Sequence, residues 1–245
     1  MLDVPQLTAE EILSRVLHRD GLMLVIDKPA GLPVHRGPKG GPNLEASFDA
    51  LRFGLPRPPV LAHRLDKDTS GCLVLGRHRK ATASLGLLFK HGKIAKTYWT
   101  VVEGGPAGNE GTINLPLGRL NAERGWWQKP DPEGQEAITN WKVLGRGDGL
   151  TWLAMEPVTG RTHQLRVHAA SQGWPIVGDN IYGTQASLRR LRNEKFIPRF
   201  GEPRLHLHSR EIGIPISKNK EPVHVVAPAP EHMHERLRAC GWNGE

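Results

Sequence analysis

A chain of 245 residues, 38% of them hydrophobic and 24% charged, is long enough to bury a hydrophobic core and is typical of a soluble globular protein. Two cysteines, Cys72 and Cys240, exclude a disulfide framework, no apolar run is long enough to cross a membrane, and the N-terminus lacks a signal-peptide pattern, so we expect a cytoplasmic protein. Lysine and arginine number 33 against 25 acids, and this formal charge of +8 favours a polyanion such as nucleic acid as partner.

The N-terminal part of the chain predicts two helices and two strands. Residues 8–21 combine a capping box, Thr8 with Glu11, with apolar residues at helical spacing, which predicts a short amphipathic helix ending near Gly21. The elements expected after it are an apolar strand over 22–31, a basic Gly- and Pro-rich loop over 31–43, a helix over 44–54, and a loop over 63–71 before the strand CLVLG.

The remainder of the chain mixes helices with short strands. The expected elements are a helix over 80–92, a strand over 96–104, short strands separated by glycine turns from 112 to 160, a helix over 162–173, and a strand over 224–228. Strands and helices do not alternate regularly, and no internal repeat occurs. This pattern favours an α+β fold with a largely antiparallel sheet over a doubly wound parallel one.

The stretch HRLDKDTSG at 63–71 places two carboxylates in a loop rich in turn-forming residues. A calcium loop that began at Asp66 would need a bidentate Glu at its twelfth position, where Arg77 stands, so no metal is expected. No pair of cysteines has zinc spacing, and no phosphate-binding glycine loop occurs. Asp68, Thr69 and Ser70 are therefore interpreted as turn and capping residues that hold Asp66 in place.

Four side chains, three of them polar and one apolar, remain as candidates for a functional site. Asp66 precedes a buried strand, and Tyr98 carries the first aromatic hydroxyl of the chain. Arg161 stands at the expected start of a helix, and Leu165 follows four residues later, which places the two on one helix face if the helix begins early enough. An arginine paired with a carboxylate suits a nucleophilic carboxylate that works without a metal or an organic cofactor.

Five blocks of the sequence resemble the RluA family of pseudouridine synthases. They are DKPAGLPVH, HRLDKDTSG, KTYWTVVEG, TGRTHQLRVHAASQGWPIVGDNIYG and RLHLHSREIGIP, in the order of the family, from about 20 to about 230. The resemblance implies an α+β pseudouridine synthase fold, a mostly antiparallel mixed sheet flanked by helices and loops, with a central cleft. It further implies a catalytic domain over 21–230, a helical extension over 1–20 and a tail over 231–245, without a separate N-terminal RNA-binding domain.

The same resemblance implies an isomerase that converts uridine in ribosomal or transfer RNA to pseudouridine without a cofactor. Asp66 would attack the nucleoside or stabilise the detached sugar, and Arg161 would pair with it. Tyr98 would lie against the uracil, Leu165 would pack beside the base, and Arg64 would fill the gap left by the flipped uridine. We expect a monomer.

Alternatives to these interpretations stay open at this point. A non-catalytic RNA-binding or ribosome-assembly protein with the same fold would need none of these residues together, and a metal-dependent nuclease would use Asp66 and Asp68. Tyr98 fits a strand core as well. The basic stretch 186–206 is either a solvated face or a phosphate-binding surface, and Trp126 and Trp127 either stack on bases or pack on the domain.

Overall fold

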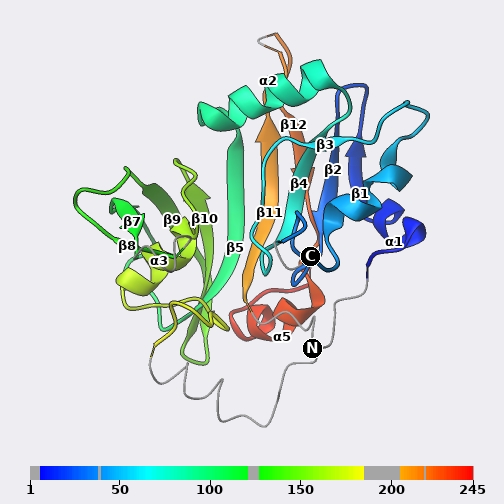
Figure 1. Ribbon diagram of the computed structural model, residues 1–245. Coiled ribbons are helices and arrows are strands. Elements are labelled where there is room, and N and C mark those ends of the chain that lie inside the picture. Colours follow the sequence, from blue (N-terminus) through cyan, green and yellow to red (C-terminus); the bar gives the residue numbers. More distant parts are fainter. Residues whose placement is uncertain (1–5, 38–39, 121–126, 185–204, 218, 245) are drawn as a thin grey trace. The chain divides into compact units, whose positions relative to one another are not determined.

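The computed structural model describes residues 6–37, 40–120, 127–184, 205–217 and 219–244 (Figure 1). The described chain divides into two compact units. Unit 1 contains residues up to 96 together with 209–229, and unit 2 contains 97–184, 205–208 and 230–244. Among the described residues, no helix has both the length and the apolar character needed to span a membrane. The predicted limits of the catalytic domain, 21–230, stay a prediction.

Unit 1 is built on a sheet whose strands pair mostly antiparallel. Its elements are α1 (Ala9–Leu13), β1 (Val16–Arg19), β2 (Met23–Lys28), the 3₁₀ helix η1 (Leu44–Leu51), β3 (Val60–Leu61), β4 (Ser70–Gly76), α2 (Arg79–Lys90), β11 (Leu207–Ile214), which enters from unit 2, and β12 (Val223–Val226). The strand order is β1-β2-β4-β11, with β3 paired to β4 and β12 to β11.

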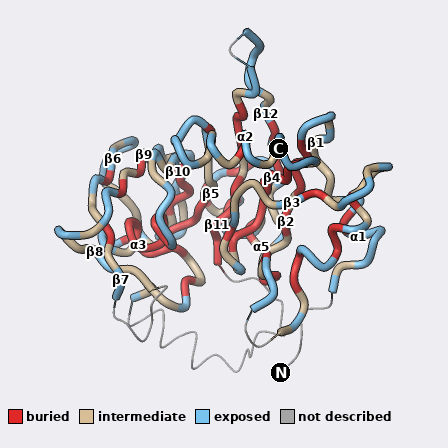
Figure 2. Tube along the Cα trace, turned by 45° about the horizontal axis from the view of Figure 1, so that its top comes forward, coloured by how far each residue is buried: buried red, intermediate tan, exposed pale blue. Residues whose placement is uncertain are grey.

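The core of unit 1 explains why its strands are almost continuously apolar. Val25 of β2, Val74 of β4 and Ile212 of β11 share one cluster with Leu85 of α2, so the helix covers that face of the sheet. Figure 2 shows buried chain along β2, β4 and β11. A strand covered on both faces has no need of polar alternation, and β4 is buried at all seven positions.

The helix predicted over 8–21 is wrong beyond Leu13. The capping box at Thr8 is present, but the helix ends at Leu13, and Val16–Arg19 form strand β1 instead. This strand pairs antiparallel with β2, with Val16 opposite Ile26. Val16 and Leu17 fit either helical or strand spacing, and the open edge of β2 decides between them. The helix predicted over 44–54 is a 3₁₀ helix.

Unit 2 is a second antiparallel arrangement. Its elements are β5 (Ala95–Glu103), which enters from unit 1, β6 (Glu110–Asn114), β7 (Leu117–Arg119), β8 (Gln128–Pro130), β9 (Ile138–Gly147), β10 (Leu150–Pro157), α3 (Gln164–Ser171) and α5 (Glu231–Ala239). The strand order is β5-β10-β9-β6, and β7 pairs with β8 apart from it. Asp148 and Gly149, both at positive φ, form the two-residue connection from β9 to β10 that a twisted hairpin favours.

The α+β fold predicted from the sequence is confirmed. The segment expected to be a tail, 231–245, contains helix α5, which buries Met233 and Leu237. Of the interpretations left open, Trp126 and most of the basic stretch 186–206 lie outside the described residues.

Candidate active site

The loop that carries the predicted catalytic carboxylate connects β3 to β4 in unit 1. Asp66 is partly buried there, and a turn follows it in which the Thr69 N–H donates to the Asp66 carbonyl over 3.2 Å. Thr69 and Ser70 are buried, and Gly71 has φ 101°, a conformation that favours glycine. The turn predicted at this place is confirmed.

A buried lysine from the end of β2 holds this loop. Lys28 has no exposed surface, and its Nζ donates to three carbonyl oxygens, those of Pro29 at 2.8 Å, Lys67 at 2.9 Å and Thr69 at 2.8 Å. All three N–H bonds of the ammonium group are thereby used. The Gly31 N–H also donates to the Lys67 carbonyl, at 2.9 Å. The turn after β2 and the loop around Asp66 are therefore joined through the backbone.

The electrostatics of the loop centre on this ammonium group. Burial lowers the pKa of Lys28 to about 7, and the negative charges of Asp68, Asp66 and Asp27 oppose that shift. Burial raises the pKa of Asp27 to about 6, against the charges of Arg15 and Lys28. Asp27 and Lys28, the last two residues of β2, consequently titrate close to neutral pH. Sequence analysis did not identify Lys28, although a lysine at the end of an apolar strand is a signal that could have raised it.

The two residues ahead of the loop have different environments. His63 accepts a hydrogen bond at Nε2 from the Val74 N–H over 3.0 Å, and its ring stacks on Phe89 with centroids 4.1 Å apart. Burial lowers the pKa of His63 to about 3, so the ring is neutral at physiological pH. The side chain of Arg64 is exposed and makes no hydrogen bond or ion pair with the described part of the chain.

Tyr98 and Leu165 belong to one apolar cluster in unit 2. Tyr98 is half-buried in β5, where it lies opposite Met155 of β10. It packs against the cluster that contains Met155 and Leu165, and Leu165 is 6% exposed. Both the core interpretation of Tyr98 and its predicted contact with a base fit this position, because part of the side chain stays accessible.

Arg161 lies in the loop before α3 and not on the helix. The helix begins at Gln164, because His163 adopts φ 54° and interrupts the helical backbone. The expected helix face shared by Arg161 and Leu165 is therefore wrong. Arg161 is exposed, and its Nε donates to the Glu136 carbonyl over 2.9 Å. Its Nη1 and Nη2 groups have no partner within the described ranges.

A buried glutamine fixes the loop that contains Arg161. The Oε1 of Gln164 accepts from the Thr159 hydroxyl at 2.8 Å and from the Arg161 N–H at 3.0 Å. Its Nε2 donates to the Ile138 carbonyl and to the Thr139 hydroxyl, at 3.0 Å each. Gln164 is 3% exposed, so this amide binds the loop to the first residues of β9 away from water. Sequence analysis missed it, since the sequence gives no sign of its partners.

A second buried polar group supports α3. Arg166 forms a two-bond ion pair with Asp179, Nε to Oδ2 at 2.8 Å and Nη2 to Oδ1 at 2.7 Å. Although burial opposes the shift, the hydrogen bonds and charge of Arg166 lower the pKa of Asp179. Asp179 also accepts the Tyr182 N–H, and the Tyr182 hydroxyl lies 2.7 Å from Nδ1 of His163. This network therefore extends to His163, the residue just before the first residue of α3. Sequence analysis did not predict the network.

The predicted site residues fall in both units. Asp66 and Arg64 belong to unit 1, whereas Tyr98, Arg161 and Leu165 belong to unit 2. The pairing of Asp66 with Arg161 therefore stays a prediction. Within the described ranges, no three His, Cys, Asp or Glu side chains gather in a way that could hold a metal ion.

Residues 22–171, more than half of the chain, match the family model described as RNA pseudouridylate synthase. The chain belongs to the RNA pseudouridine synthase family. The resemblance to RluA-type synthases read from the five sequence blocks is confirmed, and the chain is an RNA pseudouridine synthase, an isomerase.

Relatives of this synthase align along nearly its full length. It is 42% identical over 222 residues to an uncharacterized RNA pseudouridine synthase of Zymomonas mobilis, covering 90% of this chain and 95% of the relative. It is 34% identical over 244 residues to ribosomal large subunit pseudouridine synthase D of Buchnera aphidicola, covering 97% and 75%. The solved structure of human RNA pseudouridylate synthase domain containing 4 is similar with a TM-score of 0.74 and 28% identity, covering 94% and 95%.

Proposed function

We propose that this synthase isomerises a uridine of large-subunit ribosomal RNA, with Asp66 as the essential carboxylate. The observation that carries the assignment is the loop of Asp66, whose backbone is held from below by the buried ammonium of Lys28 while Asp66 itself remains partly accessible. The substrate follows from the name of the Buchnera relative, which refers to the ribosomal large subunit. Transfer RNA is the other substrate that the sequence leaves open.

The reaction rearranges one nucleoside without adding or removing atoms. The bond from N1 of uracil to C1′ of the ribose breaks, the base turns, and a bond from C5 to C1′ forms. The proton on C5 leaves, and N1 gains one, so no cofactor is consumed. Asp66 attacks the nucleoside or stabilises the detached sugar, and the guanidinium of Arg161 orients that carboxylate and offsets the cost of its burial.

Tyr98 and Leu165 are assigned to the uracil. Leu165 packs beside the base, and Tyr98 lies against it and assists the removal of the C5 proton. His63 is unsuited to that proton transfer, because its Nε2 already accepts the Val74 N–H and its pKa lies near 3. A phenol within the cluster of Leu165 is the remaining candidate.

Base flipping brings the uridine to these residues. Extruding a base from structured RNA costs a few kcal/mol. A planar guanidinium can stack and donate hydrogen bonds in the vacated space, and Arg64 is exposed without a competing partner in the described chain. We assign Arg64 to that space.

The test replaces Asp66 by Asn in cells that lack the wild-type gene, followed by a chemical map of pseudouridine in ribosomal and transfer RNA. Asp68→Asn, which removes the other carboxylate of the same turn, is the matched control. We expect one or more ribosomal sites to disappear with Asp66→Asn and to persist with Asp68→Asn. Unchanged sites in Asp66→Asn would refute the role of Asp66, and a map in which only transfer RNA changes would refute the ribosomal substrate.

The purified protein provides the second readout. Wild type should release tritium from RNA labelled at C5 of uridine, and Asp66→Asn should release none. RNA binding without tritium release from wild type would favour the non-catalytic alternative, and strand cleavage that a chelator abolishes would favour the metal-dependent nuclease. The monomeric state and the cytoplasmic location stay predictions, the first of which light scattering checks.

A further inference from the structure

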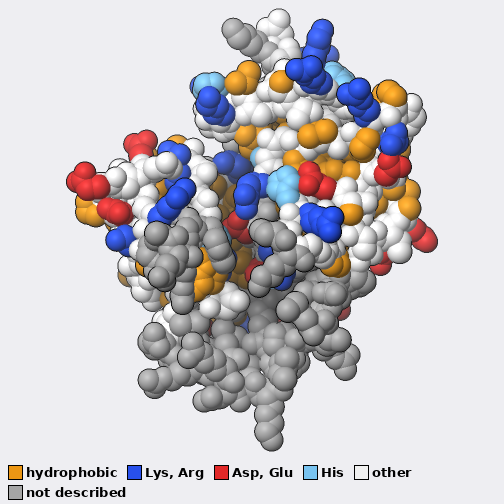
Figure 3. Space-filling model, viewed as in Figure 1, with side chains coloured by type: hydrophobic (Ala, Val, Ile, Leu, Met, Phe, Trp, Pro, Cys, Tyr) orange, Lys and Arg blue, Asp and Glu red, His pale blue; other side chains and the backbone are white. Residues whose placement is uncertain are grey.

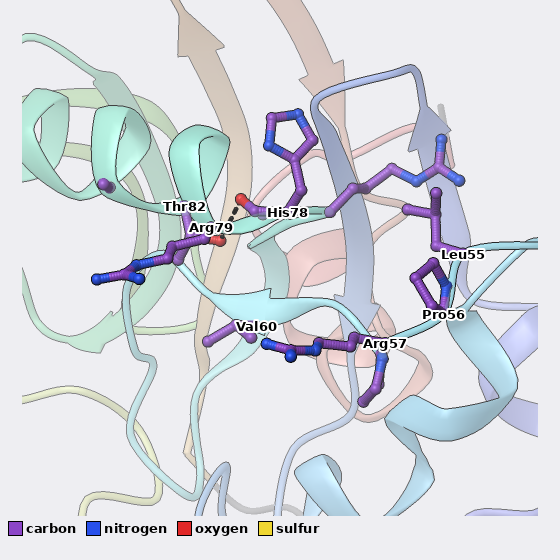
Figure 4. A pocket seen from close by; sticks show the side chains of 11 residues that line it. Leu55, Pro56, Arg57, Val60, His78, Arg79 and Thr82 are labelled. Carbon is purple, nitrogen blue, oxygen red and sulfur yellow. Dashed lines mark hydrogen bonds between the residues drawn. The ribbon is translucent and has the colours of Figure 1, made fainter.

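A groove opens on unit 1 between the segment before β3 and the start of α2 (Figure 4). Its volume is about 540 Å³. Its apolar lining comes from Leu55, Pro56, Val60 and Ala83, and Val60 is 55% exposed. An exposed β-branched side chain over a hollow of this size is an apolar surface without a partner in the described chain.

Two arginines flank this apolar surface. Arg57 and Arg79 line the groove with exposed guanidinium groups, and Figure 4 shows Val60 between them. Neither arginine has a hydrogen bond or ion pair with any residue that the structure describes, and no acid is among the residues lining the groove. Guanidinium groups left unpaired beside an apolar surface are available to an anionic ligand.

The groove lies in the segment that makes this chain basic. Residues 50–102 contain ten lysines and arginines and only two acids, Asp66 and Asp68, so their formal charge of +8 equals that of the whole chain. Lysine and arginine side chains, with hydrophobic ones between them, lie over the α2 end of unit 1 in Figure 3. Leu87, 54% exposed, follows Ala83 by one helical turn and extends the apolar strip along α2.

We propose that this groove is a second RNA-binding surface, which holds unpaired nucleotides of the substrate with bases against the apolar lining and phosphates on Arg57 and Arg79. Stacking on apolar or planar side chains beside cationic groups is the common mode of binding single-stranded RNA. An apolar peptide would leave both guanidinium groups without a counter-charge, whereas RNA satisfies both parts of the surface. The inference rests on RNA as the substrate.

The distance between the groove and Asp66 indicates how many nucleotides separate this contact from the target uridine. Gly76, at the end of β4, lines the groove, whereas Asp66 comes before Ser70 at the other end of that strand. Six strand residues at about 3.3 Å each separate the two ends by about 20 Å. A stacked strand rises about 3.4 Å per nucleotide. RNA that runs alongside β4 would therefore reach the groove about six stacked nucleotides away from the target uridine.

The binding test uses a labelled oligouridylate of 20 nucleotides and the double variant Arg57→Ala/Arg79→Ala. Each lost contact to a single-strand phosphate removes about 0.7 from the slope of log K against log salt, so the slope should fall by about 1.4. The affinity should drop about 25-fold at 0.1 M salt and approach that of wild type near 1 M. Lys142→Ala/Lys220→Ala removes the same charge from exposed residues outside the groove and should change the slope by less than half as much.

The apolar part needs a separate variant. Val60→Asp keeps an exposed position and places a negative charge where the bases would lie. We expect it to weaken binding of the oligouridylate more than binding of a blunt RNA duplex, because duplex bases cannot reach the lining. Equal weakening of both, or a slope for the arginine variant that matches the lysine control, would overturn the proposal.

Activity separates this inference from the proposed function. With ribosomal RNA from cells that lack the gene, the arginine variant should raise KM by about tenfold or more and leave kcat within about twofold of wild type. A wild-type enzyme without activity would overturn the proposed function. An active wild type whose groove variants keep the wild-type KM would overturn the groove alone, and it would leave the surface to a protein partner.

Discussion

Replacing Lys28 by Met tests whether the loop of Asp66 depends on its buried ammonium. Methionine has similar length and no donor, so the carbonyls of Pro29, Lys67 and Thr69 each lose the hydrogen bond from Lys28. Bonds to a charged group contribute about 1.5–3 kcal/mol each, together about 5–9 kcal/mol. Against this, a lysine pKa lowered from 10.5 to about 7 means that burial of the charge costs about 4–5 kcal/mol at neutral pH. We expect a net destabilisation of roughly 0–5 kcal/mol.

Catalysis should suffer far more than stability in Lys28→Met. The loop loses two of its three backbone hydrogen bonds to the end of β2 and the turn after it, and a displacement of about 1 Å at a catalytic group can cost about 100-fold in rate. Tritium release is measured at a temperature well below the unfolding midpoint of the variant. Leu85→Ala is the matched control, because it opens the core of unit 1 at a cost of about 2–5 kcal/mol without touching the loop.

The same variant changes how stability depends on pH. In wild type the folded state releases the Lys28 proton near pH 7 and the unfolded state near pH 10.5, so the unfolded state binds more protons between these values. Stability of wild type should therefore rise with pH across this window, by up to about 1.4 kcal/mol per pH unit from this group. Lys28→Met should lack that contribution in denaturant titrations. Wild-type kcat together with an unchanged pH profile would refute the reasoning.

Three further predictions concern stability. Asp179→Ala leaves Arg166 as an unpaired buried charge and should cost about 3–5 kcal/mol in urea unfolding, whereas a cost below about 1 kcal/mol would contradict the buried pair. Gly145→Ala would place a Cβ against the Cys240 carbonyl, so it should lower the unfolding temperature by several degrees. Burial lowers the pKa of His63 from 6.5 to about 3, so the unfolded state binds more protons between these values and stability falls as pH falls from 6.5 towards 3. In thermal melts, the unfolding temperature of His63→Gln should therefore fall less steeply with acid than that of wild type.

Elements with a strong local pattern could be predicted from the sequence, and elements decided by partners could not. The helix at Arg79–Lys90 and the strand at Ala95–Glu103 show clear spacing and composition. Strand β1 was mistaken for helix, since only the edge of β2 selects its conformation. Helix α5 was missed because it buries only Met233 and Leu237, too few apolar positions for a helical signal.

The residues of the candidate site also divide into those that a local sequence pattern indicates and those that depend on distant partners. Asp66 was proposed from its motif, because the residue type and its neighbours carry the signal. Lys28 and Gln164 were missed, although each holds a predicted site loop. The two partners of Lys28 in the loop are backbone carbonyls 39 and 41 residues away, and those of Gln164 in β9 are 26 and 25 residues away. A backbone carbonyl has no residue type, so no sequence pattern can identify it as an acceptor.

Lys28 in unit 1 and Gln164 in unit 2 have the same structural role, which is to hold a loop in position. A loop that is proposed to contact RNA cannot bury many apolar side chains, so apolar packing alone cannot hold it in one conformation. In each unit a buried polar side chain from a regular element instead bonds to the backbone or to a partly buried hydroxyl of the loop. These ties use the backbone carbonyl at Lys67, which any residue at that position would keep. Lys67→Ala keeps the carbonyl that accepts from Lys28, so it should reduce kcat less than Lys28→Met does. An effect on kcat as large as that of Lys28→Met would mean that the side chain, and not the backbone, sets the site.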